Sequence, residues 1–351
     1  MMFPEIDTPA VLVDLDIAEA NIDRFQTHCE QHGIRLRPHI KTHKLPRLAR
    51  RQIAAGAIGI TCQKISEAEA MLAEGGISDV LLTYNVLGAA KLARLRALAT
   101  RVRLTVVCDN EVVAEGLSDA FGSGRMALDV LVECDTGAGR CGVTSPEAAA
   151  RLAQRLNDLP GLRFAGLMTY PPAGREAAVQ DWLARAVAAC AARGLRVDTV
   201  STGGTPGMWQ AQDVSCATEY RAGTYIYNDR SLVVRGTCGW KDCALTVLAT
   251  VVSVPASDRA IIDAGSKVLT SDLLGLSGYG HVLERPDIAI ESLSEEHGTL
   301  RAEVIGLRVG DRVRIVPNHA CAVSNMLDRV ELTRGDRHEA TAPVAARGRV
   351  W

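Results

Sequence analysis

The stretch "AIGITCQKISEAEAMLAEGGISDVLLTY", residues 57–84, decides the fold. It starts with a short apolar run, continues into a segment whose apolar residues have helical spacing, and returns to a second apolar run after two glycines. Two buried strands joined by a helix form one unit of a parallel sheet. The stretch therefore predicts a strand, a helix and a second strand, in that order.

The same alternation extends in both directions, from about residue 10 to residue 235, and its first apolar run is "AVLVDL" at 10–15. Short strand-like runs separated by amphipathic segments of ~10–15 residues are typical of repeated βα units. Roughly eight units fit, which favours an α/β fold of the (β/α)8, TIM-type barrel class over an open doubly wound sheet. The first βα turns lack G-x-G-x-x-G, which weakens a dinucleotide-binding alternative.

The pattern of apolar runs in the sequence changes after about residue 240. Runs such as "ALTVLATVVSVPA" and "DRVRIVPNH" read as strands joined by turns, with no strong helix between them. A segment of this kind predicts a smaller β-domain. We expect a barrel over residues 10–235 and a C-terminal β-domain over 236–351, joined by residues 1–9.

Composition narrows the class of protein. The chain has 351 residues, a formal net charge of -2 and ten cysteines. The near-neutral charge argues against a nucleic-acid partner, and no apolar run approaches the ~20 residues that cross a membrane. The acidic N-terminus does not resemble a signal peptide. Most cysteines lie in strand-like runs, and the Cys238–Cys243 spacing fits no common zinc module, so we expect a reduced, cytoplasmic protein.

Basic residues gather in "RLRPHIKTHK", residues 35–44. Side chains alternate along a strand, so Arg35, Arg37, His39 and Lys41 share one face, with Lys41 at the strand's end. Active sites of TIM-type barrels lie at the carboxyl ends of the strands. A lysine there can form a Schiff base with an aldehyde; the alternative is a solvated basic loop.

Two Gly/Thr turns follow two successive strands, "STGGTPG" at 201–207 and "EYRAGTY" at 219–225. Backbone N–H groups and hydroxyls in such turns can hold a phosphate. Together with a lysine at a strand end, they suggest a phosphorylated aldehyde cofactor, pyridoxal 5'-phosphate (PLP). Arg140, in "DTGAGRCGV", is placed at another strand end as a partner for the cofactor's phenolate oxygen.

Nine motifs in this order cover nearly the whole chain: "TPAVLVDLD", "RPHIKTHK", "GITCQKISEAEA", "DTGAGRCGV", "STGGT", "RAGTY", "IDAGSK", "SEEHG" and "VPNHAC". They resemble the D-threonine aldolase and D-serine dehydratase family, relatives of alanine racemase. The resemblance implies an N-terminal PLP barrel followed by a β-domain. It also implies a homodimer, because the family completes its active site across a subunit interface.

The resemblance implies roles for individual residues. Lys41, and not Lys44, is the cofactor lysine. The other residues carried over are Gln63, Arg140 and Tyr170 along the cofactor or substrate, Thr205, Gly223 and Thr224 at the phosphate with Tyr225 nearby, and Arg221 facing the pyridine ring.

His319 and Cys321 are the candidate metal ligands. Their i, i+2 spacing puts both side chains on one face of a strand. Taken alone, the pair reads as a buried histidine and cysteine; in the family, H-x-C or H-x-D holds a divalent ion. Sulfur with imidazole favours Zn2+, whereas an aspartate would have favoured Mn2+ or Mg2+.

The family implies a D-3-hydroxy amino acid as substrate and leaves two lyase reactions open. Retro-aldol cleavage gives glycine and an aldehyde, while elimination of water gives a keto acid and ammonia. The H-x-C pair resembles the dehydratases, and "TYPPAGREAA" lacks the histidine that aldolases carry after Tyr170, which leaves His43 or a metal-bound hydroxide as the base. The compact length of the chain and the particular residues in its motifs favour D-threonine aldolase. A racemase ranks third. It would need a second base on the opposite face of the cofactor, usually a tyrosine from the β-domain of the partner subunit, and Tyr279 is the only tyrosine in that domain.

Overall fold

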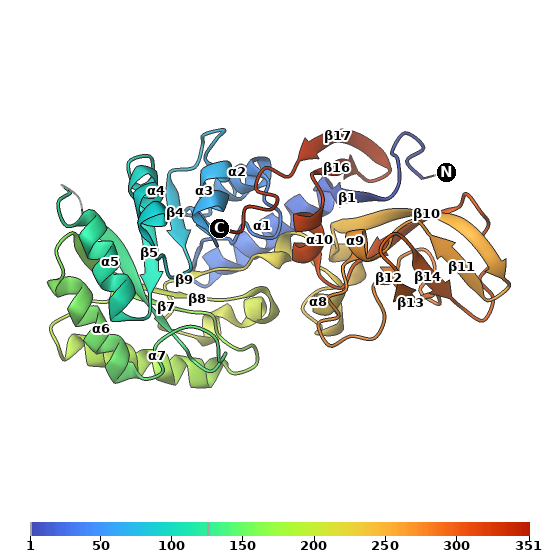
Figure 1. Ribbon diagram of the computed structural model, residues 1–351. Coiled ribbons are helices and arrows are strands. Elements are labelled where there is room, and N and C mark those ends of the chain that lie inside the picture. Colours follow the sequence, from blue (N-terminus) through green and yellow to red (C-terminus); the bar gives the residue numbers. More distant parts are fainter. Residues whose placement is uncertain (1, 125–126) are drawn as a thin grey trace. The chain divides into compact units, whose positions relative to one another are not determined.

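The computed structural model describes residues 2–124 and 127–351 (Figure 1). The chain divides into two compact units. Of the described residues, the first unit holds 2–24, 42–45 and 224–348, and the second holds 25–41, 46–124, 127–223 and 349–351. The domain boundary expected between residues 235 and 236 remains a prediction.

The second unit is built on a parallel sheet of eight strands, in the order β2-β9-β8-β7-β6-β5-β4-β3. The bounds are β2 Arg35–Leu36, β3 Ile60–Cys62, β4 Asp79–Leu82, β5 Arg103–Cys108, β6 Leu128–Cys134, β7 Leu162–Thr169, β8 Thr199–Thr202 and β9 Glu219–Tyr220. The first and last strands of this order also meet, since Ile40 N–H donates to Thr61 C=O at 3.0 Å and Thr61 N–H donates to Pro38 C=O at 2.8 Å. These two bonds close the sheet, which confirms the predicted barrel class.

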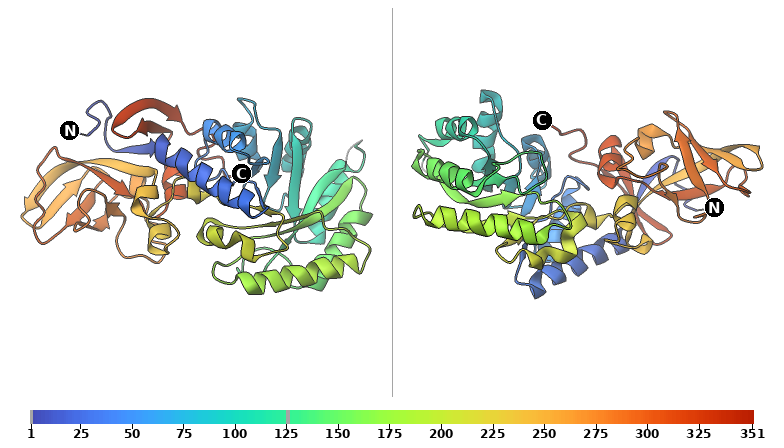
Figure 2. Two further views of the ribbon diagram at one scale, coloured as in Figure 1. Left: turned by 180° about the vertical axis from the view of Figure 1, so that it is seen from behind. Right: turned by 90° about the horizontal axis from the view of Figure 1, so that it is seen from below.

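Helices cover the outside of this sheet (Figures 1 and 2). They are α2 Pro46–Ala54, α3 Ile65–Met71, α4 Ala89–Ala99, α5 Glu111–Phe121, α6 Pro146–Asp158 and α7 Glu176–Ala191, with α1 Leu15–Gln31 shared between the units and the 3-10 helix η1 Thr205–Asp213 after β8. Helix α6 illustrates the local cause. The Ser145 hydroxyl accepts the Ala148 N–H at 3.2 Å at its start, and Ala149, Leu152 and Leu156 form a buried stripe facing the sheet.

The first unit is mainly antiparallel. Its strands are β1 Ala10–Asp14, β10 Leu245–Ala256, β11 Arg259–Ile262, β12 His281–Val282, β13 Ala289–Leu293, β14 Gly298–Arg301, β15 Arg312–Val316, β16 Arg329–Arg334 and β17 Arg337–Pro343. This confirms the expected β-domain. One expectation was wrong: β1, the run predicted to open the barrel, pairs with β10 and β16 of this sheet. A buried apolar run fits either kind of sheet, and only tertiary pairing decides between them.

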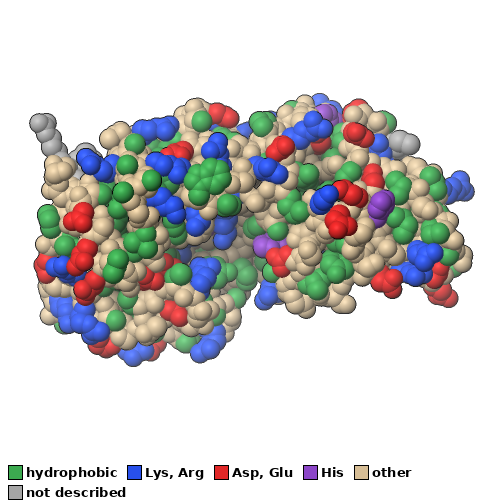
Figure 3. Space-filling view, in the orientation of Figure 1, with side chains coloured by type: hydrophobic (Ala, Val, Ile, Leu, Met, Phe, Trp, Pro, Cys, Tyr) green, Lys and Arg blue, Asp and Glu red, His purple; other side chains and the backbone are tan. Residues whose placement is uncertain are grey.

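Short helices connect the strands of the first unit: η2 Thr224–Ile226, α8 Arg230–Val234, η3 Trp240–Asp242, α9 Ser266–Leu269 and α10 Ala320–Met326. On the visible face of both units, acidic and basic side chains are interspersed (Figure 3). All ten cysteines are free thiols. Among the described residues, no helix is long and apolar enough to span a membrane.

Candidate active site

Lys41 follows β2 at the carboxyl-terminal mouth of the barrel, and its side chain is half-buried. Its backbone N–H donates to His39 Nδ1 at 3.3 Å, and His39 Nε2 lies 3.3 Å from Gln63 Oε1. The Gln63 amide in turn donates to the Thr83 carbonyl at 2.9 Å. The structure therefore brings Lys41 and Gln63 together through His39, across the ends of β2, β3 and β4.

The turns after β8 and β9 also meet. The Thr205 hydroxyl accepts the Gly223 N–H at 3.2 Å. Thr205 opens η1, with Gly204 as its N-cap, so the first-turn amide N–H groups of this segment, other than at Pro206, come directly after β8. The buried Thr202 hydroxyl, three residues earlier, has no hydrogen-bond partner among the described residues. Hydroxyls and amide donors at a helix start suit a phosphate group, so these residues fit the phosphate end of PLP.

Arg140 and Tyr170 lie together beside this turn. The Arg140 guanidinium is 4.8 Å from the centre of the Tyr170 ring, within the range of a cation–π contact. The same ring packs on Gly204, where an added Cβ would lie 2.9 Å from Tyr170 Cε2. The predicted neighbours from β6, β7 and β8 are thus assembled at one place.

Glu133 was not singled out from the sequence. It lies near the end of β6, 4% exposed, and burial, with the nearby Asp109 charge, raises its pKa to about 7 against the pull of Arg140 and Arg221. The available signal was a second charged residue, after Asp129, inside the mainly apolar run "LDVLVEC". A carboxyl that titrates near neutrality at a strand end is typical of functional sites.

Arg221 is buried at 5% exposure and points into the barrel from the residue after β9. Its guanidinium donates to the Ser201 hydroxyl and, at 2.7 Å, to the Thr169 carbonyl. Burial lowers the pKa of Arg221 to about 10, while Glu219 and Glu133 oppose that shift. The side chain is therefore a fixed cation inside the mouth.

The first unit holds His319 and Cys321. The expectation that both lie on a strand was wrong: β15 ends at Val316, His319 is the N-cap of α10, and Cys321 lies in its first turn. Pro317 cannot donate to a strand neighbour, and the Asp229 carboxylate accepts the Ala320 N–H at 3.1 Å, which favours the helix start.

The two side chains nevertheless meet. A hydrogen bond with Cys321 raises the pKa of His319 to about 9, against a lowering by burial, and Asp272 adds to the rise. His319 Nδ1 lies 2.6 Å from Asp272 Oδ2. Hydroxyls of Thr42 and Thr224 lie 3.0 and 3.4 Å from the Cys321 sulfur.

Imidazole nitrogen and thiol sulfur in contact are a donor pair that Zn2+ accepts. Within the described ranges, no group of three or more His, Cys, Asp or Glu side chains is placed to hold a metal ion. A metal ion held by this pair would keep further coordination positions for water or substrate. Asp272 behind the imidazole matches the carboxylate that usually orients a metal-binding histidine.

His43 and Tyr225 complete the predicted set, and both are 1% exposed. His43 Nδ1 accepts the Leu45 N–H at 3.1 Å, and its ring stands edge-on to Tyr227. A neutral ring that accepts at Nδ1 carries its proton on Nε2. The predicted residues are divided between the units: Lys41, Gln63, Arg140, Tyr170, Thr205, Arg221 and Gly223 in the second, and His43, Thr224, Tyr225, His319 and Cys321 in the first.

A closed parallel barrel with a lysine and a hydroxyl-lined turn at its carboxyl-terminal mouth has the parts that a PLP-dependent barrel enzyme needs. Two family models match the chain. "Alanine racemase, N-terminal domain" covers residues 13–231, and "Putative serine dehydratase domain" covers residues 244–333.

Relatives match over nearly the full length. A D-threonine aldolase from Arthrobacter sp is 36% identical, over 98% of this chain and 93% of the relative. The D-threo-3-hydroxyaspartate dehydratase of Delftia sp. (strain HT23) is 35% identical, over 90% and 91%. The chain therefore belongs to the D-threonine aldolase and D-serine dehydratase family of PLP-dependent lyases, with an alanine racemase-type barrel.

Solved structures agree. The crystal structure of D-threonine aldolase from Filomicrobium marinum has a TM-score of 0.92 at 35% identity, covering 99% of this chain and 98% of that one. A cysteine-to-alanine variant of D-threo-3-hydroxyaspartate dehydratase, in the metal-free form, has a TM-score of 0.87 at 31% identity, covering 98% of each chain. The predicted family, fold class and enzyme class are confirmed.

Proposed function

We propose that this enzyme is a D-threonine aldolase, which cleaves D-threonine and related D-3-hydroxy amino acids to glycine and an aldehyde. The observation that carries the proposal is the 36% identity to a D-threonine aldolase over 98% of the chain. The barrel mouth supports a PLP-dependent enzyme, because Lys41, Gln63 and the Thr205–Gly223 turn all lie at the carboxyl ends of its strands.

The predicted cofactor-binding residues have assigned roles in this proposal. Lys41 would hold the cofactor covalently at its aldehyde carbon, and Thr205 and Gly223, with Thr224 and Tyr225 after them, would hold its phosphate. When bound, PLP supplies the electron sink for the bond that breaks at the substrate's α-carbon. Arg140, with Tyr170 packed against its guanidinium, would orient the phenolate oxygen. Arg221 would face the ring nitrogen.

His319 and Cys321 hold a divalent metal ion in this proposal, with Zn2+ preferred over Mn2+ or Mg2+ because one ligand is sulfur. The ion supplies Lewis-acid polarisation of a substrate oxygen. Asp272 keeps the proton of His319 on Nδ1, so that Nε2 is presented as the ligand.

His43 accepts a hydrogen bond at Nδ1, so its proton is on Nε2. In this proposal His43 is therefore a hydrogen-bond donor to the substrate and not a base.

D-Serine or 3-hydroxyaspartate dehydratase is the second candidate, and Cys321 is the observation that favours it. One solved structure of a similar D-threo-3-hydroxyaspartate dehydratase is that of a cysteine-to-alanine variant in the metal-free form. In this alternative Lys41 takes the α-proton, and the substrate loses its hydroxyl as water.

Product analysis separates the two reactions. The purified enzyme with PLP and Zn2+ or Mn2+ is given D-threonine or D-serine, with the L-enantiomers and Lys41→Ala as controls. Glycine with acetaldehyde from D-threonine establishes the aldolase. Pyruvate with ammonia from D-serine establishes the dehydratase and overturns the first proposal. Neither product from either substrate excludes a D-threonine aldolase and a D-serine dehydratase and leaves the 3-hydroxyaspartate dehydratase for the same assay with that substrate.

Assembly and compartment belong to the same proposal. We infer a homodimer in the cytoplasm: the family supports the dimer, and ten free thiols suit a reducing compartment. Size-exclusion chromatography with light scattering tests the dimer, and a mass of one chain, 37.5 kDa, would exclude it.

A further inference from the structure

The interior of the barrel is divided into an apolar side and a polar side. Side chains from β4 to β7 form an apolar cluster: Leu81, Val107, Leu131, Ala165 and Met168. Toward β2, β8 and β9 the buried side chains are polar: Arg37, Ser201, Glu219 and Arg221, at 7, 0, 2 and 5% exposure. Barrels of this class are usually filled by branched apolar residues, so the polar side needs an explanation.

These four side chains are linked by a continuous series of hydrogen bonds. Arg37 Nε donates to Glu219 Oε2 at 3.2 Å, and the Ser201 hydroxyl donates to Glu219 Oε1 at 2.6 Å. The Ser201 oxygen then accepts from Arg221. Because the Ser201 proton is committed to the carboxylate, its lone pairs face the guanidinium. Glu219 thus fixes the position of the Ser201 hydroxyl, and that hydroxyl fixes the position of the Arg221 guanidinium.

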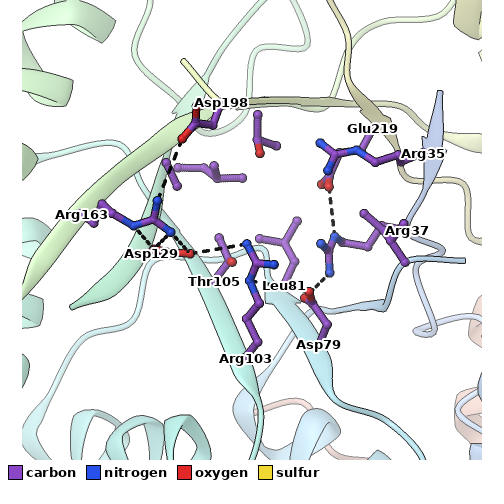
Figure 4. Close-up of a pocket in the computed structure, with 14 residues that line it drawn as sticks. Arg35, Arg37, Asp79, Leu81, Arg103, Thr105, Asp129, Arg163, Asp198 and Glu219 are labelled. Carbon is purple, nitrogen blue, oxygen red and sulfur yellow. Dashed lines mark hydrogen bonds and ion pairs between the residues drawn. The ribbon is translucent and has the colours of Figure 1, made fainter. Parts of the chain in front are cut away.

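The Arg37 end of this series of contacts lies at the amino-terminal mouth of the barrel. Figure 4 shows Arg37 between Asp79 and Glu219, which line a cavity of about 300 Å³ at that mouth. Arg37 donates to Asp79 at 2.5 Å. Other charges around the cavity pair among themselves, as Arg163 does with Asp129. Arg37 is therefore fixed from two sides.

Electrostatics match the geometry. Burial would raise the pKa of Glu219, but Arg37, Ser201 and Arg221 outweigh that effect and lower it, so the residue is a carboxylate. A buried charge network of this kind rarely adds stability over apolar packing. The presence of this network inside a barrel points to a role at its Arg221 end, where Arg221 also donates to the Thr169 carbonyl.

We propose that Glu219 and Ser201 are positioning residues that aim Arg221 at the ring nitrogen of the cofactor. The inference rests on the proposed function, which assigns Arg221 to that nitrogen. A cation held there disfavours a second positive charge on the ring, so the nitrogen stays unprotonated. If the guanidinium swivels away, the nitrogen can take a proton, and the bound cofactor becomes pH-sensitive.

The test compares holoenzymes of the wild type, Ser201→Ala, Glu219→Gln and a control, Ser118→Ala. Ser118 is also a buried serine of the second unit, and its hydroxyl donates to the Pro160 carbonyl at 2.8 Å, away from the network. Ser201→Ala leaves the Arg37 ion pairs with Glu219 and Asp79 in place, so it serves if Glu219→Gln does not fold. The readouts are the visible spectrum of the bound cofactor between pH 6 and 9, kcat and KM.

We expect Ser201→Ala and Glu219→Gln to bind PLP and to show a new pH-dependent step in the visible band. A misplaced guanidinium should lower kcat by about 10- to 100-fold, with KM changed much less. Ser118→Ala should match the wild type. A folded Ser201→Ala holoenzyme with the wild-type spectrum and kcat overturns the inference. A wild type that binds no PLP overturns the proposed function instead.

Discussion

Asp272 Oδ2 lies 2.6 Å from Nδ1 of His319, on the far side of the imidazole from the nitrogen that would bind a metal. This contact fixes both the ring's orientation and its tautomer. Carboxylates in this position commonly contribute 10- to 100-fold to metal affinity. The structural relationship therefore gives the first prediction.

Asp272→Ala should weaken Zn2+ binding by about 10- to 100-fold, because the imidazole loses the group that holds its proton. Titration against a chromophoric chelator measures this affinity without turnover. Asp258→Ala is the matched control, since Asp258 is an exposed carboxylate of the same unit that pairs with Arg301 at 2.9 Å. Equal Zn2+ affinity of the two variants would contradict the role of Asp272.

Cys321→Asp should change which metal supports activity. Replacing the thiol by a carboxylate exchanges a soft ligand for a hard one, so preference should move from Zn2+ toward Mn2+. Chelator-treated enzyme, reloaded with each metal in turn, gives the ratio of the two activities. A ratio unchanged from the wild type would show that Cys321 is not a ligand. His319→Ala should lose Zn2+ binding in the chelator titration.

Lys41→Ala should abolish both the visible absorption of the purified enzyme and its turnover, because no covalent link to the cofactor remains. Lys44→Ala should keep the colour. Its ammonium donates to Asn325 Oδ1 at 2.7 Å and to the Ala346 carbonyl at 3.3 Å, so its loss should cost about 1–3 kcal/mol of stability. Denaturant unfolding and absorption spectra measure both effects. The reverse pattern would make Lys44 the cofactor lysine.

Thr205→Val should weaken PLP binding about tenfold or more, since it removes a hydroxyl donor for the phosphate and the acceptor of the Gly223 N–H. Thr205→Ser keeps the hydroxyl and should bind nearly as the wild type does. Cofactor affinity follows from quenching of tryptophan fluorescence during PLP titration. If Thr205→Val and Thr205→Ser bind PLP equally, the hydroxyl has no part in holding the phosphate.

Glu133→Gln should stabilise the protein above neutral pH. The folded-state pKa of Glu133 is raised to about 7 from 4.5, so its favourable contribution is present below about pH 4.5 and is lost as the pH rises to 7. The difference approaches about 3 kcal/mol at pH 8 and vanishes at low pH. Urea unfolding at pH 5 and pH 8 checks it; a variant with no gain at pH 8 would place the Glu133 pKa near its ordinary value.

Much of the fold follows from the sequence because apolar periodicity reports local structure. Residues 57–84 became β3, α3 and β4, as their pattern predicts. The run at 10–15 shows where the pattern stops being informative. A buried strand looks the same in a parallel barrel and in an antiparallel sheet, and β1 found its partners in β10 and β16.

The candidate site divides in the same way. Lys41, the two glycine turns and the His319–Cys321 pair could be named because motifs carry them. Asp272 could not, since nothing local separates it from the other aspartates of the chain, and the roles of Glu133 and Ser201 could not be read from the runs that contain them. Only their burial and contacts distinguish them.

The sequence by itself determined the family, the barrel with its β-domain, and the residue types that suit a phosphorylated aldehyde and a soft metal ion. Tertiary structure decided that His319 and Cys321 meet at a helix start instead of along a strand, and that one side of the barrel carries a polar chain to Arg221. The physical reason is that motifs record local chemistry. Burial, pKa values and hydrogen-bond partners are set by residues distant in the chain, such as Asp272, which lies 47 positions before His319.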